Sequence, residues 1–205
     1  VRRQRQMCIR DSSGTVRFGG QGIRNIPFGQ LMDEISYVAQ DNFLFDKSIR
    51  ENIRMGNPDA SDEEVEAAAK AANCHDFIMQ LEQGYDTMAG DAGDRLSGGE
   101  RQRITIARAM LKQASVIILD EATAYADPEN EALIQQAISK LVAGKSLIVV
   151  AHRLNTIRNA DQILVVANGE IVGRGIQEEL LENCPLYRKM WQDYAGSTEG
   201  GVEDV

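Results

Sequence analysis

Short apolar runs alternate with helical segments along this chain, and that alternation constrains the fold more than any other feature. The runs Ile35–Ala39, Val116–Leu119 and Leu147–Ala151 are rich in β-branched side chains, which is typical of strands covered on both faces. Because helical segments separate the runs, each strand would be followed by a crossover that returns to the same sheet. The sequence therefore predicts an α/β fold with a parallel sheet.

The helices have recognisable start signals. Ser61 and Glu64 form a capping-box pattern that opens an alanine-rich helix through Ala72. The glycine-rich segment 90–99 precedes a second helix, over about 100–112. These signals place a loop and then a helix between the first two predicted strands.

The last third of the chain has equally local signals. Asp127-Pro128 supplies an N-cap and a first-turn proline for a helix that ends at Gly144. Asn168-Gly169 lies between two apolar runs and predicts a β-hairpin. The polar segment 196–205 is predicted to be disordered.

Composition excludes some classes of function. Net charge is −9, from 31 acidic and 22 basic residues, so we expect no nucleic-acid partner, because such binding needs a lysine- and arginine-rich surface. No apolar run approaches the roughly 18 residues of a membrane-spanning helix. The three cysteines are far apart, which suits a reduced compartment and argues against disulfides or a zinc site.

Polar residues follow each of the three apolar runs: Gln40, then Asp120-Glu121, then His152. Parallel sheets bind ligands at the carboxyl ends of their strands, so we expect one shared site there. Leu119-Asp120-Glu121 has the form of a Walker B motif. Its aspartate suits Mg²⁺ and its glutamate can polarise a water molecule that attacks phosphorus.

Leu96-Ser-Gly-Gly-Glu100 precedes a predicted helix and is the more specific motif. Backbone N–H groups, a serine hydroxyl and the positive end of a helix form an anion site without any lysine. The two glycines allow a phosphate to approach the backbone closely. A flexible turn with a serine cap would explain Ser97 but not the paired glycines.

In this order and spacing, Leu96–Glu100, Val116–Glu121, Asp127 and His152 resemble the ATP-binding cassette (ABC) ATPases, and the resemblance runs from about Ser13 to Tyr194. It implies a P-loop NTPase-like parallel sheet with a helical signature-motif subdomain over about 48–112. It also implies the nucleotide-binding domain of a transporter, which couples ATP binding and hydrolysis to transport at the cytoplasmic face of the membrane.

The same resemblance implies which residues touch ATP or its metal: Gln40, Ser97, Gly98, Gly99, Asp120, Glu121, Asp127 and His152. By this resemblance Glu121 is the general base and His152 contacts the γ-phosphate.

The resemblance also implies that Asp120 and Gln40 serve Mg²⁺, and that Ser97, Gly98 and Gly99 bind the nucleotide of a partner subunit. The implied partners are a transmembrane domain, fused or separate, and a second ABC ATPase domain.

The chain is similar to the exporter-type branch. Gly90–Gly93 resembles that branch's coupling loop, while Phe43–Phe45 and Ser48–Ile53 resemble the segment that meets the transmembrane domain. Plain core packing is the alternative for these aromatic residues. The chain departs from the usual pattern at Asp91, where glutamate is usual, and at two further places. Glu100 replaces the commoner glutamine, and 124–131 is similar to siderophore-associated half-transporters.

No GxxxxGK[ST] phosphate-binding loop occurs in the chain; Gly144-Lys145-Ser146 lacks the first glycine and precedes a strand. Arg2–Asp11 matches one reading frame of a transposase adapter used for sequencing libraries, so we expect 1–12 to be foreign rather than a basic arm. We therefore expect an ABC ATPase domain over 13–195 without its Walker A part, and a fragment that is inactive alone.

Two other functions remain open on the sequence. A degenerate ABC module could bind a partner without hydrolysis, although intact Glu121 and His152 speak against decay. The chain could also be the head of a DNA-maintenance ABC ATPase. Against this, it has no sustained heptad repeat of the kind that forms a coiled coil, and its net charge is negative.

Overall fold

The computed structural model describes residues 14–120, 128–151 and 154–199. Contacts divide the chain into two compact units, Val1–Ile118 with Thr123–Ile148 and Leu119–Ala122 with Val149–Val205. None of the helices over the described residues combines the length and apolar character that a bilayer crossing requires.

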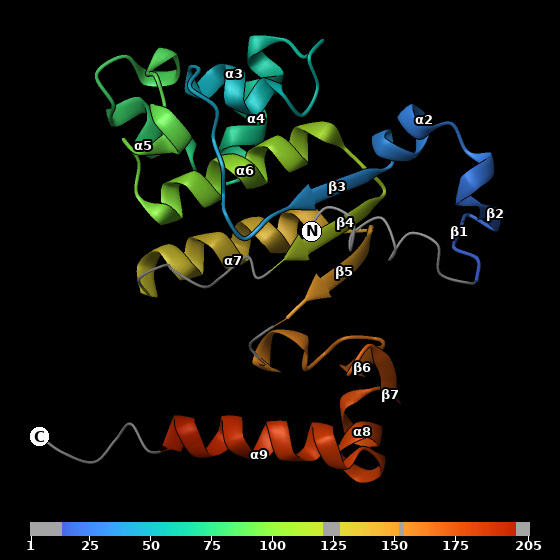
Figure 1. Ribbon diagram of the computed structural model, residues 1–205. Coiled ribbons are helices and arrows are strands. Elements are labelled where there is room, and N and C mark those ends of the chain that lie inside the picture. Colours follow the sequence, from blue (N-terminus) through green and yellow to red (C-terminus); the bar gives the residue numbers. More distant parts are fainter. Residues whose placement is uncertain (1–13, 121–127, 152–153, 200–205) are drawn as a thin grey trace, which may run out of the picture. The chain divides into compact units, whose positions relative to one another are not determined.

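A three-stranded sheet has the order β3-β4-β5, with β3 over Ile35–Val38, β4 over Val116–Asp120 and β5 over Ser146–Val150. Backbone hydrogen bonds join the strand starts: Val116 donates to the Glu34 carbonyl, and Ser146 to the Ser115 carbonyl, each at 3.0 Å. Because the starts lie side by side, the strands run in parallel, as the arrows in Figure 1 show. The predicted parallel α/β sheet is confirmed.

Burial of the strands differs from the prediction. In β4 only Ile117 and Leu119 are buried, and their neighbours are half-buried. In β5 the side chains of Leu147, Ile148 and Val150 are 41%, 53% and 48% exposed, so the prediction of a fully covered strand is wrong for the described residues. The physical reason is cover, because the side chains of a strand point to the two faces of the sheet, and their burial depends on which segments pack over those faces.

The helices of the first unit are α2 (Phe28–Asp33), α3 (Ile49–Arg54), α4 (Asp62–Ala71), α5 (His75–Gln80), α6 (Gly98–Lys112) and α7 (Pro128–Val142). Helix α6 packs against α3, α4 and α7 (Figure 1). It is therefore covered on several sides, and Ile104, Ile106 and Ala107 are fully buried. This central helix begins at the glycine-rich motif.

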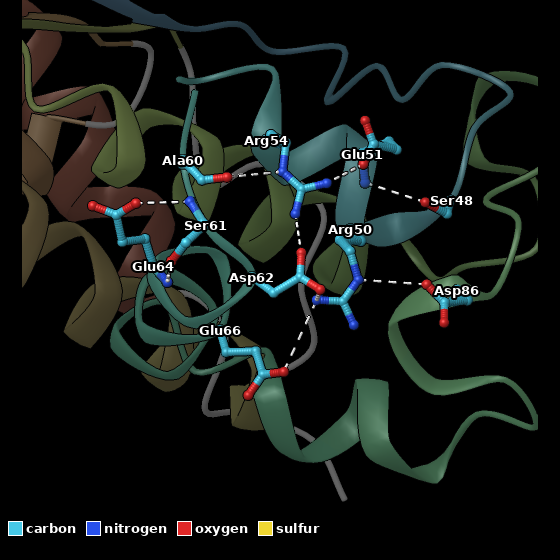
Figure 2. Close-up of polar contacts among 10 residues, drawn as sticks. All are labelled: Ser48, Arg50, Glu51, Arg54, Ala60, Ser61, Asp62, Glu64, Glu66 and Asp86. Atoms are coloured by element: carbon cyan, nitrogen blue, oxygen red, sulfur yellow. Dashed lines mark hydrogen bonds and ion pairs between the residues drawn. The ribbon is translucent and has the colours of Figure 1, made fainter. Parts of the chain in front are cut away.

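Ion pairs join α3 to α4 and to the short 3-10 turn η2 (Gly84–Asp86), as Figure 2 shows. Arg50 lies 3.2 Å from Asp62, 3.9 Å from Glu66 and 3.4 Å from Asp86, and Arg54 also pairs with Asp62. The carboxylates are exposed, so each pair adds little by itself, but the shared geometry fixes α3 against α4.

The remaining elements of the first unit are short: β1 (Arg17–Phe18), β2 (Gln21–Gly22) and the 3-10 turns η1 (Ile23–Asn25) and η3 (Asp91–Gly93). The predicted capping box at the start of α4 is confirmed. The Ser61 N–H donates to the Glu64 carboxylate at 2.7 Å, and the Glu64 N–H donates to the Ser61 hydroxyl at 3.3 Å (Figure 2).

The second unit contains η4 (Leu154–Ile157), the hairpin β6 (Ile163–Ala167) and β7 (Glu170–Gly175), α8 (Gln177–Asn183) and α9 (Pro185–Glu199). The hairpin turn is as predicted, because Asn168 and Gly169 take φ values of 52° and 83°. The hydrophobic core of the second unit consists of Leu154, Ile163, Val165, Leu180, Cys184 and Tyr187.

Helix α9 continues to Glu199, into the segment 196–205 for which disorder was expected. A helix already formed by apolar packing continues through polar residues at little cost, because each added residue gains a hydrogen bond.

Candidate functional site

The glycine-rich motif forms the first turn of α6. Ser97 is the N-cap, in extended conformation, and its hydroxyl accepts the Glu100 N–H at 3.3 Å. The helix starts at Gly98, earlier than the predicted Glu100, because the serine rather than a glycine caps it. Ser97 is exposed and Gly98 half-buried, so the positive end of a 15-residue helix opens to solvent.

Glu100 folds back onto the cap. Both the backbone N–H and the hydroxyl of Ser97 donate to the same Glu100 carboxylate oxygen, each at 2.8 Å. Together with the reverse bond from the Glu100 N–H, this completes a capping box. The donors expected to receive a phosphate are therefore holding a carboxylate in this structure.

Gly99 is buried against α7. A Cβ at this position would lie 3.0 Å from the Cγ and 3.2 Å from the Oδ1 of Asn130, tighter than ordinary van der Waals contact. Arg103 donates to that Oδ1, and its guanidinium lies 5.1 Å from the centre of the Phe77 ring. The second motif glycine thus has a packing role, since it lets the first turn of α7 approach α6.

The sequence interpretation missed Arg103 and Asn130. The signal for Arg103 was its spacing, because four residues from Gly99 places it on the same face of the helix. Arg103 is only 5% exposed despite its charge. Asn130 offered no local signal beyond its place in α7, three residues after Asp127.

The segment after β3 includes Gln40 and contacts α6 through Asn42 and Phe43. Gln40 is exposed, and its carbonyl accepts from the Asn42 amide at 3.2 Å. The Thr105 hydroxyl donates to Asn42 at 3.2 Å, and Arg108 donates to the Phe43 carbonyl at 3.3 Å. The structure therefore joins the predicted glutamine segment to the helix that begins with the glycine motif.

Asn52 links α3 to this segment and to α6. Its side chain is fully buried and accepts from the Phe45 N–H at 2.9 Å and from Arg108 at 3.0 Å. Arg108 also donates to the Asn52 carbonyl at 2.8 Å. Burial lowers the pKa of the Arg108 guanidinium to about 10, so it stays cationic at neutral pH.

The rings of Phe43 and Phe45 contact each other edge to face, with centroids 5.1 Å apart. They are 48% and 43% exposed, so the core-packing alternative for these residues is wrong. They form an apolar surface beside α3, which the buried Asn52 holds in place.

Asp120 is the last residue of β4 and is half-buried. Glu121, Asp127 and His152 lie outside the described residues. Over the described ranges there is no group of three or more His, Cys, Asp or Glu side chains that could hold a metal by itself.

A pocket of about 620 Å³ lies beside the Arg103–Asn130 contact. Its lining mixes cations, amides and apolar groups: Lys70, Asn73, His75, Asp76, Phe77, Gln80, Arg103, Asn130 and Leu133. It is a different place from the cap of α6, because its lining includes none of the residues predicted to touch ATP.

Comparison with known proteins gives a consistent result. The family model described as ABC transporter matches residues 6–124. That match begins inside the segment 1–12, whose attribution to adapter sequence stays a prediction.

Among curated relatives, the mycobactin import ATP-binding/permease protein IrtA of Mycolicibacterium smegmatis is 48% identical over 88% of this chain and 21% of its own length. Human ATP-binding cassette sub-family B member 6 is 48% identical over 92% of this chain and 22% of its own. The ATP-dependent lipid A-core flippase of Syntrophus aciditrophicus is 47% identical over 88% and 30%.

A solved structure of a bacterial Atm1-family ABC exporter with ATP bound superposes with a TM-score of 0.82 at 37% identity, over 94% of this chain and 33% of the exporter chain. The chain therefore spans about a fifth to a third of the length of the proteins it matches.

Proposed function

The chain belongs to the ABC transporter family, and from that premise we propose that it forms the nucleotide-binding domain that couples ATP binding and hydrolysis to transport across a membrane. The observation that carries the proposal is the start of α6, where an exposed Ser97 and two glycines present backbone and hydroxyl donors at a helix N-terminus. In the proposed domain, over 13–195 with its helical subdomain at about 48–112, these donors receive the γ-phosphate of a nucleotide held by a second subunit.

Hydrolysis needs a base and a contact to the phosphate. Glu121 accepts a proton from the attacking water molecule while the water oxygen bonds to the γ-phosphorus. The bond between the γ-phosphorus and the β,γ-bridging oxygen breaks, and ADP leaves. His152 donates a hydrogen bond to the γ-phosphate, and Asp127, the D-loop aspartate by resemblance, is among the residues that bind the nucleotide. These roles are implied by the resemblance of Glu121, Asp127 and His152 to the motifs of the family.

The residues present suit Mg²⁺ as part of an ATP complex. Asp120 offers one half-buried carboxylate, Gln40 offers an amide oxygen, and the described residues lack a self-sufficient metal cluster. Mg²⁺ in phosphate sites is commonly held by one or two protein ligands together with phosphate oxygens and water. When bound, it would neutralise charge on the β- and γ-phosphates.

The partners follow from the exposed aromatic pair and from the relatives. Phe43 and Phe45 offer an apolar surface that suits contact with a transmembrane domain. Relatives are described as ATP-binding/permease proteins, which supports such a partner and a position at the cytoplasmic face of a membrane. Dimerisation with a second ATPase domain completes each phosphate site.

The test is ATP hydrolysis by a full-length transporter that contains this domain, with Glu121→Gln as the variant. The wild type should hydrolyse ATP, and the variant should bind ATP but hydrolyse it at least about 100-fold more slowly, as loss of a general base predicts. A variant with wild-type turnover would remove Glu121 from its role. A wild type that binds ATP without hydrolysis would instead identify a non-hydrolysing module.

A further inference from the structure

The start of α6 presents one oxygen to two donors. The Ser97 N–H and the Ser97 hydroxyl both point to the same Glu100 carboxylate oxygen at 2.8 Å. The cap of α4 has the same sequence pattern and two of the same bonds, from the Ser61 N–H at 2.7 Å and the Glu64 N–H at 3.3 Å. At α6 the hydroxyl also donates to the carboxylate, so Glu100 takes up both donors of the serine.

This arrangement conflicts with phosphate binding. An N–H and a hydroxyl at a helix N-terminus stabilise whichever anion reaches them, and a carboxylate and a phosphate compete for the same hydrogen atoms. A phosphate that replaces the carboxylate also meets its negative charge one helical turn away. Binding therefore requires Glu100 to swing outward and to accept a like-charged neighbour.

We propose that Glu100 is an internal competitor of the γ-phosphate, a carboxylate that occupies the Ser97 donors until ATP in the partner subunit displaces it. The inference rests on the proposed function, because it needs Ser97 to receive a phosphate. Glu100 thereby raises the ATP concentration at which the paired domains close, and keeps the motif ordered while no nucleotide is present.

The experiment compares Glu100→Gln with Glu64→Gln in the full-length transporter. Both substitutions keep an oxygen that can accept the serine N–H and remove one charge from a capping box, so their structural costs should match. Only Glu100 faces the proposed phosphate position. ATP hydrolysis is measured against ATP concentration, and thermal unfolding is measured without nucleotide.

We expect Glu100→Gln to lower the ATP concentration for half-maximal hydrolysis about three- to tenfold, because it replaces a charge-assisted contact by a neutral one and removes the repulsion. Glu64→Gln should leave that concentration unchanged, and the two variants should lower Tm by similar small amounts. Maximal turnover should stay within about twofold of wild type, since the base is untouched.

Two results would overturn the inference while the proposed function stands: an ATP requirement equal in both variants, or one that rises in Glu100→Gln. A wild type without ATP hydrolysis would refute the proposed function and this inference together.

Discussion

At the scale of single residues, Asn130 contacts two parts of α6 at once. It lies against Gly99 in the first turn of α6, the proposed phosphate-binding turn, and accepts a hydrogen bond from the buried Arg103. The same amide therefore fixes the spacing of α6 and α7 at their first turns. A side chain of this kind positions a site without touching the ligand.

Asn130→Leu should destabilise the domain by about 1–3 kcal/mol, because it keeps the branched shape of the side chain but removes the acceptor of a buried charged donor. In the full-length transporter, turnover should fall more than the ATP concentration for half-maximal hydrolysis changes, since the proposed role of the motif is in the closed dimer. Thermal unfolding and steady-state hydrolysis measure both effects.

Asn130→Asp, which keeps the acceptor, should retain most of the activity. Gln135→Leu, which changes an exposed amide on the same helix, serves as the control. If Asn130→Leu behaved like that control, the positioning role of Asn130 would be wrong.

At the scale of elements, the close approach of α3 to α6 depends on Gly56, which follows α3. A Cβ there would lie 3.1 Å from the carbonyl carbon of Arg108 and 3.2 Å from the backbone nitrogen of Lys112. Backbone atoms in the middle of a packed helix cannot yield as a flexible side chain does. The backbone just after α3 therefore touches the backbone of α6 at this point.

Gly56→Ala should cost about 1–3 kcal/mol of stability, the range for overpacking. Gly29→Ala is the matched control, because Gly29 lies inside α2 and a Cβ there meets nothing within 4 Å. Gly29→Ala should be neutral or slightly stabilising, since alanine favours the helix. Chemical denaturation measures the free energy of unfolding of the two variants. An equal loss in both would contradict the prediction.

The elements also show what sequence can and cannot predict. The capping box of α4 and the Asn168-Gly169 turn were predictable because their partners lie within three residues. The exposure of Ile148 was not, because burial depends on which segments cover a strand. The contact of Arg103 with Asn130 joins residues 27 positions apart, a pairing that no local pattern specifies.

At the scale of the whole molecule, the proposed site is shared between two subunits. Ser97 would act on the nucleotide of its partner, whereas Glu121 would act on its own. Defects in these two residues should then fall in different places when two variant subunits pair.

Ser97→Arg and Glu121→Gln should each abolish hydrolysis in a homodimer but leave ATP binding by a separate subunit nearly unchanged. A mixed dimer has one intact site, so equal mixing should restore up to about a quarter of wild-type activity if the sites act independently. No recovery on mixing, with mixed dimers verified by differential tags, would show that Ser97 works within its own subunit.

The hydrogen bond between Asn52 and Arg108 connects α3 to α6, and α6 is stiff enough to transmit a displacement along its axis. Arg108 lies eleven residues beyond Ser97, roughly 16 Å along the helix axis, and a helix hardly compresses over that length. A displacement applied to Phe45 would pass through Asn52 into α6, because the Asn52 side-chain oxygen accepts from both the Phe45 N–H and Arg108. The N-terminal turn of α6 is the one that would bind a phosphate. A force on the aromatic pair and the binding of ATP would therefore both act on α6, a single rigid helix.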